Sequence, residues 1–134
     1  MINFRGFLQV LVAGIIMLLV SACATTPKAD LAASRDIFHH SADVVQQAAV
    51  NALILTGFQL TKKEKNYLQG NRPLKPGLII SSGGETVGVW LNLVSPDKTQ
   101  VKIHTTKTFI GYVGQKDWGN EILYKITKEL SGQQ

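Results

Sequence analysis

Cysteine is nearly absent from this chain, which holds a single one, Cys23, among its 134 residues. One cysteine excludes an intramolecular disulfide and any zinc site built from several cysteines. Acidic residues are also scarce, because nine Asp and Glu stand against 14 Lys and Arg, for a formal net charge of +5. Between residues 57 and 116 the count is nine basic residues against three acids. This excess favours an anionic partner, and since no nucleic-acid-binding motif accompanies it, we expect no nucleic acid.

Motifs for catalysis and metal binding are missing as well. The chain has no G-x-S-x-G elbow, no P-loop and no dinucleotide-binding fingerprint. Its histidines, His39, His40 and His104, have no cysteine or carboxylate at the spacing of a metal site. We therefore expect solvated histidines, and we predict no catalytic residue, no metal site and no bound cofactor.

What the chain does contain begins with an apolar N-terminus. Residues 1–6 carry one positive charge, Arg5, and residues 7–20 are almost continuously apolar. This order is typical of the n-region and h-region of an export signal, and an uncleaved membrane anchor is the alternative. The apolar run ends in Val20-Ser21-Ala22-Cys23.

These four residues resemble the lipobox of the bacterial lipoprotein family, an aliphatic residue and two small residues before a cysteine. The resemblance implies cleavage between Ala22 and Cys23, a diacylglycerol on the Cys23 thiol and an acyl chain such as palmitate on the freed amine. Residue 24 is alanine, not the aspartate that marks inner-membrane retention in many Gram-negative lipoproteins. In a Gram-negative organism, the resemblance implies a lipid-anchored protein on the periplasmic face of the outer membrane.

We predict three parts along the chain: a signal peptide at 1–22, a lipidated tether at 23–36 and a periplasmic domain at 37–134. The tether is small, polar and aperiodic, although Leu31, Ile37 and Phe38 could dock on the domain and shorten it. Apolar residues at helical spacing predict one helix that begins at Ser41 and stops at Gly57. A second helix is predicted from a cap at Asp117 to residue 132.

Alternating apolar residues between these helices predict four or five short antiparallel strands, near residues 58–61, 66–69, 78–80, 87–93 and 101–105. The last two form a hairpin in which Leu91 pairs with Val101 or Ile103. Both helices are amphipathic and only one sheet face is strongly apolar, so we expect an α+β two-layer sandwich with an N-terminal and a C-terminal helix. This order of elements resembles the small helix-flanked sheet domains of envelope lipoproteins, BamC-like modules among them.

The same register places Trp90 opposite Lys102 or His104 on the sheet face away from the core. There, these three residues would form an amphipathic patch suited to a glycan, a lipid headgroup or a protein edge; the alternative buries Trp90 under a helix or a neighbouring strand. Two loops are further candidates, each with a structural alternative as a plain turn or a cover over the core. Their residues are Ser81, Ser82, Gly83 and Gly84 in SSGGE, and Phe109 and Tyr112 in FIGYVG.

From these observations we expect a non-enzymatic envelope lipoprotein that acts as a structural or interaction module. The membrane would hold it through the lipid on Cys23, and the candidate partners are an envelope protein, a glycan or anionic headgroups. The alternatives are a small periplasmic enzyme or cell-wall hydrolase accessory, and a domain that binds a small anion at SSGGE.

Overall fold

The computed structural model describes residues 26–32, 34–74, 83–107 and 115–132. The predictions for the signal peptide, for a strand at 78–80 and for six candidate site residues lie outside these ranges. Those six residues are Ala22, Cys23, Ser81, Ser82, Phe109 and Tyr112. Among the described residues, no helix combines the length and the apolar character needed to cross a membrane.

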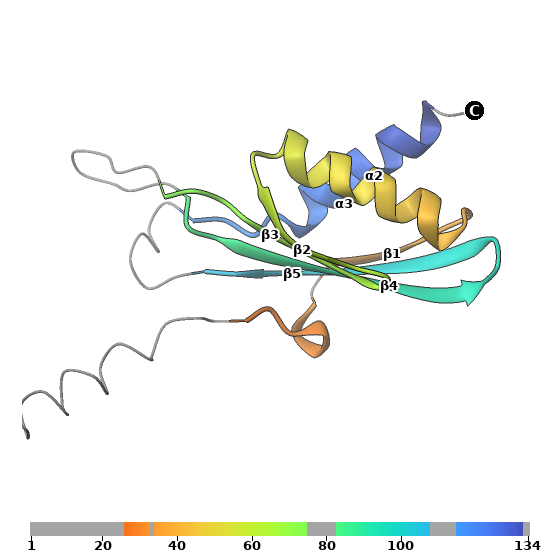
Figure 1. The fold of residues 1–134 in the computed structure, drawn as a ribbon, viewed down its shortest axis with the longest axis horizontal. Coiled ribbons are helices and arrows are strands. Elements are labelled where there is room, and N and C mark those ends of the chain that lie inside the picture. The colour runs from red at the N-terminus through yellow and green to blue at the C-terminus, as the bar shows by residue number, and fades with distance from the viewer. Residues whose placement is uncertain (1–25, 33, 75–82, 108–114, 133–134) are drawn as a thin grey trace, which may run out of the picture.

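The described residues form one five-stranded antiparallel sheet with two α-helices packed on one of its faces, which confirms the predicted α+β class (Figure 1). The strand order across the sheet is β1-β5-β4-β3-β2. The elements in chain order are η1 (Ala29–Leu31), β1 (Ser34–Phe38), α2 (Ala42–Leu55), β2 (Gln59–Glu64), β3 (Tyr67–Asn71), β4 (Thr86–Ser95), β5 (Lys98–Thr106) and α3 (Gly119–Ser131).

Both helices begin and end close to the predicted residues. Ser41 occupies the N-cap of α2 without a side-chain capping bond, and Gly57 ends the turn after that helix with φ of +85°, where a side chain would be strained. At the start of α3, the Gly119 amide donates to Asp117 Oδ1 at 2.9 Å, which satisfies one of the free amides of the first turn. The limits of both helices therefore lie within two residues of those that the local sequence predicted.

The core lies between the helices and one face of the sheet. The predicted hairpin is confirmed, with Leu91 opposite Val101 and Val89 opposite Ile103. Because side chains alternate along a strand, these four residues share the face that α2 and α3 cover. The fully buried core side chains also include Val45, Ala48, Ala49, Ala52 and Leu53 from α2, Ile122 and Ile126 from α3, and Leu68 and Val87 from the sheet.

The fifth strand is β1, which sequence patterning did not predict. It pairs antiparallel with β5, from Ser34 opposite Ile103 to Phe38 opposite Thr99, and both Ser34 and Phe38 are buried. The sheet therefore begins inside the segment that the sequence assigned to the tether. The residues before it also pack on the domain, since Pro27 and Ala32 are buried. In Figure 1, η1 lies on the opposite side of the sheet from α2 and α3.

Candidate interaction surface

The sheet face that the helices leave uncovered carries all three predicted patch residues. On β4, Val87, Val89 and Leu91 point into the core, so Gly88 and Trp90 point to the opposite face. Trp90 is half-buried there, on the side of the sheet away from α2 and α3. We refer to this side of the sheet as the open face.

One row of residues crosses the open face from edge to edge. The strand registers place Arg35 opposite Lys102, Lys102 opposite Trp90, Trp90 opposite Tyr67 and Tyr67 opposite Glu64. With strands about 4.8 Å apart, these five positions span about 19 Å. We call these five residues the cross-strand row. Its cations lie at the β1 end, its aromatic rings in the centre and its one acid at the β2 end.

The centre of the row is a preformed aromatic pair. The Trp90 and Tyr67 ring centroids lie 5.2 Å apart with the planes tilted by 40°. Such pairs contribute about 0.5–1.5 kcal/mol beyond the area they bury. The Tyr67 hydroxyl donates to Gln69 Oε1 at 2.8 Å. Burial, and next the charge of Glu64, raise the pKa of Tyr67 above 10.0, so its phenol is neutral at physiological pH.

At the cationic end of the row, no described acid forms an ion pair with either side chain. The ion pairs among the described residues are Arg72 with Glu85 and Lys116 with Glu121, so neither Arg35 nor Lys102 takes part in one. Like charges directly opposite each other on neighbouring strands are destabilising. An anion bound between these two side chains would relieve that repulsion.

On the same face, His104 contacts the residues that precede β1. Its Nδ1 accepts a hydrogen bond from the Lys28 amide at 3.1 Å, and it lies opposite Gly88 in the row beside Trp90. A Cβ on Gly88 would lie 2.7 Å from Pro27 Cβ and 2.6 Å from Trp90 Cη2, so only glycine leaves room for both. Residues 26–32, which we call the docked segment, therefore lie across β4 and β5 next to the cross-strand row.

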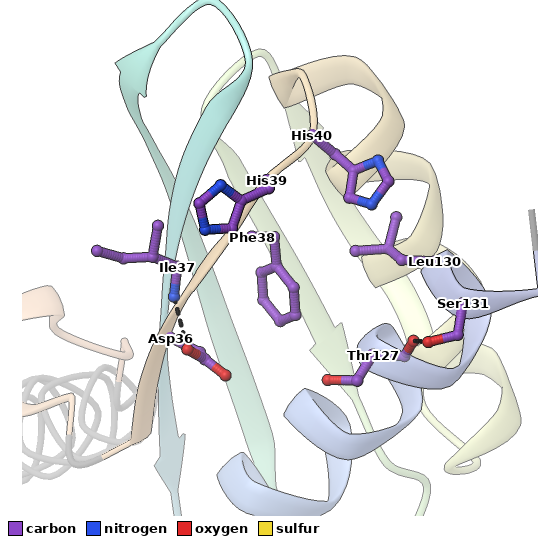
Figure 2. Close-up of a pocket in the computed structure, with 8 residues that line it drawn as sticks. All are labelled: Asp36, Ile37, Phe38, His39, His40, Thr127, Leu130 and Ser131. Carbon is purple, nitrogen blue, oxygen red and sulfur yellow. Dashed lines mark hydrogen bonds between the residues drawn. The ribbon is translucent and has the colours of Figure 1, made fainter. Parts of the chain in front are cut away.

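A groove of about 300 Å³ lies at the β1 edge of the sheet, on the side of the helices. It is bounded by β1, the residues after it and the end of α3 (Figure 2). Three of its polar side chains bond within the domain. Thr127 Oγ1 donates to the Leu123 carbonyl, Ser131 Oγ donates to the Thr127 carbonyl, and Asp36 Oδ1 accepts from the Ile37 amide. The imidazoles of His39 and His40 also line the groove and point to different sides of the chain (Figure 2), so they do not converge on one ligand position as the polar groups of a typical ligand site do. No three metal-ligating side chains gather anywhere in the described part of the chain.

The described half of the SSGGE loop is paired with the end of β3. The Gly84 amide donates to the Arg72 carbonyl at 2.7 Å, and the Gly83 carbonyl accepts from Gln115 Nε2 at 2.9 Å. The amide of Gly84 is therefore committed to the fold. This pairing agrees with the alternative of a plain turn between strands.

A buried acid next to this turn was not singled out from the sequence. Glu85 is 0 % exposed, and its Oε1 accepts from Trp118 Nε1 at 3.1 Å and lies 3.7 Å from an Arg72 nitrogen. Arg72 and Lys116 each approach the Trp118 ring, at 4.4 and 3.8 Å from its centroid. These contacts close one end of the core, so we assign the cluster a structural role.

Sequence reasoning also missed three members of the cross-strand row, namely Arg35, Glu64 and Tyr67. Tyr67 lies in a predicted strand, and its place opposite Trp90 follows only when β3 is known to neighbour β4. Arg35 lies in the segment taken for a tether, where the residues SRDIF show no clear alternation. The signal that could have found Tyr67 is the alternation of Tyr67 and Gln69 with buried Leu68.

Comparison with known proteins gives no family. No family model matches the chain, and no curated protein matches it. A solved structure with some similarity is that of a conserved protein from Geobacillus kaustophilus, with 10 % sequence identity and a TM-score of 0.40 over 73 % of this chain and 93 % of that one. At this level of similarity no function is transferred.

Proposed function

We propose that this protein is a membrane-anchored envelope lipoprotein whose α+β domain acts, without catalysis, as an interaction module through its open face. The observation that carries the proposal is the cross-strand row. It joins a preformed pair of aromatic rings to two neighbouring cations that have no ion-pair partner among the described residues. Aromatic residues and arginine are enriched at protein interfaces, and cations beside them suit an anionic partner.

The anchor in this proposal is the lipid on Cys23. The Val20-Ser21-Ala22-Cys23 motif follows a complete export signal and uses the single cysteine of the chain. Each methylene buried in a bilayer contributes about 0.8 kcal/mol, so two or three acyl chains would hold the domain durably. In a Gram-negative cell, we place the protein at the outer membrane, facing the periplasm.

An interaction module also fits the polar chemistry of the described residues better than an enzyme does. Catalysis needs titratable groups that converge on a pocket, whereas along the groove of Figure 2 the side chains of Asp36, Thr127 and Ser131 bond to nearby backbone. The two histidines of the groove, His39 and His40, point apart from each other. A small-anion site at SSGGE would need free amides, and the Gly84 amide is already bonded.

The proposal is tested by photo-crosslinking in cells from position 90, with position 124 as the matched control. Tyr124 is an aromatic residue on α3 that is 61 % exposed, on the opposite layer of the domain. We expect a discrete adduct from position 90, none from position 124, and loss of the adduct in Cys23→Ser. Equal labelling from both positions would contradict a binding role for the open face.

A further inference from the structure

Resting on the lipid anchor of the proposed function, we propose that the docked segment turns the open face toward the protein's own membrane, where the cross-strand row contacts anionic lipid headgroups. In this orientation, the sheet lies on the bilayer surface and the two helices face away from it. We call this the face-on orientation.

The docked segment lies close to the anchor along the chain. Pro27 is buried against Gly88 on the open face, and Cys23 is four residues before it. Four residues span at most about 14 Å even when fully extended. The lipid-bearing residue is therefore held near the open face and cannot reach past the sheet to the outer surface of α2 and α3.

Specific contacts hold the docked segment in place. The Lys28 amide donates to His104 Nδ1 at 3.1 Å, and Ala32 is buried at the end of the segment. Residue 34 then enters β1, which is fixed in the sheet by its pairing with β5. Both ends of the docked segment are thus attached to the same sheet, so the anchor and the open face stay on one side of the domain.

Charge is distributed unequally between the open face and the helix layer. Strand alternation and register place four cations on the open face against one acid, Glu64, and the docked segment on that face adds one charge of each sign, Lys28 and Asp30. The cations are Arg35, Lys62, Lys98 and Lys102. The helix layer has the opposite balance, with two cations against three acids, namely Lys125 and Lys128 against Asp43, Glu121 and Glu129. The positive layer is therefore the layer that carries the anchor segment.

The apolar groups that accompany these charges are mainly aromatic rings. Tryptophan and tyrosine rings are typical of the boundary between headgroups and acyl chains, because one end of each ring system is apolar and the other is polar. Trp90 and Tyr67 form such a pair on the open face. Ile37, opposite Gln100 in the next row, adds an apolar side chain that is 47 % exposed. An acidic protein could also bind these cations, but the anchor brings the membrane, and not such a protein, to this side of the domain.

The test uses the mature lipidated protein in vesicles that contain a phosphatidylcholine with a spin label on its headgroup. The label quenches the fluorescence of a tryptophan that lies at headgroup depth. A Trp90→Phe variant supplies the signal of the second tryptophan, Trp118, for subtraction. We expect Trp90 to be quenched in vesicles of phosphatidylglycerol and phosphatidylcholine, and less in vesicles of phosphatidylcholine alone.

Matched charge variants then test the cause of the orientation. Each basic residue near an anionic surface shifts the equilibrium constant toward it by about fivefold, so Arg35→Gln with Lys102→Gln should reduce the ratio of face-on to detached protein about 25-fold. Lys125→Gln with Lys128→Gln removes the same charge from the helix layer and should leave the quenching unchanged.

An insertion variant lengthens the link to the anchor and changes no residue of the described domain. About 20 Gly and Ser residues inserted between residues 25 and 26 lengthen the link from four residues to about 24, which lowers the effective concentration of the open face at the bilayer about tenfold. We expect a corresponding loss of quenching.

The outcomes separate this inference from the proposed function. If Trp90 stays unquenched in both kinds of vesicle, the membrane is not the partner of the open face. A discrete protein adduct from position 90 in cells would still support the proposed interaction module. Quenching that is equal in both kinds of vesicle would overturn the assignment to anionic headgroups. A mature protein whose intact mass shows no lipid would overturn both proposals.

Discussion

Substitution of Gly88 by alanine tests whether the docked segment lies on the open face. Glycine within a strand is less favourable than alanine by about 0.5–1 kcal/mol, so at a free position this change would stabilise the domain. At position 88, the new Cβ would lie 2.7 Å from Pro27 Cβ and 2.6 Å from Trp90 Cη2, and both separations are too short to persist. Overpacking of this kind costs about 1–3 kcal/mol, so we expect no stabilisation and a net loss of up to about 2 kcal/mol.

The assay combines urea denaturation with limited trypsin digestion at Lys28. Undocking exposes this bond, because the Lys28 amide loses its acceptor on His104. Cleavage after Lys28 should therefore be faster in Gly88→Ala. Gly132→Ala is the matched control, since its added Cβ would meet nothing closer than 3.7 Å. A stabilised Gly88→Ala variant in which Lys28 stays as resistant to trypsin as in the wild type would refute the reasoning.

Three further predictions concern the buried acid and the cross-strand row. Glu85→Ala should lower the free energy of unfolding by about 1–3 kcal/mol in urea denaturation, because it leaves the buried Trp118 Nε1 without its acceptor; a loss below that of a surface Glu→Ala change would contradict the assignment. The pKa of Tyr67 is raised, mainly by burial and next by Glu64, so its stabilising contribution is complete below about pH 10 and is lost as the pH rises through the folded-state value. Ultraviolet titration, with Tyr67→Phe subtracted, should show a raised pKa that Glu64→Gln reduces without abolishing, and a phenol that titrates at its ordinary value would contradict this. Arg35→Gln should stabilise the purified protein by about 0.2–1 kcal/mol, because it relieves repulsion with Lys102, and a destabilised variant would show that the two cations do not repel each other.

Much of the fold follows from local periodicity. Both helices and the β4–β5 hairpin carry apolar residues at spacings of about 3.6 and 2, and a turn joins the two strands of the hairpin. Parity alone placed Trp90 and Lys102 on the face away from the core. These elements could be predicted because each depends on neighbours that are close in sequence.

The remaining features depend on contacts between distant parts of the chain. β1 is short, and it is fixed by pairing with β5 more than 60 residues later. The docked segment is held by Gly88 and His104, which no local pattern connects with Pro27 or Lys28. The candidate site was therefore predicted in part, because strand parity identifies its face while only the tertiary packing identifies what lies beside it.

The most direct test of the central claim is to compare lysine reactivity in intact envelopes with that in the purified, detergent-solubilised protein. Lys62 and Lys102 report on the open face, and Lys125 and Lys128 on the helix layer. If the open face is the contact surface, labelling with an amine-reactive reagent followed by mass spectrometry should show Lys62 and Lys102 protected in envelopes and reactive after purification. Lys125 and Lys128 should react equally in both. Equal reactivity of all four lysines in both preparations would contradict the account.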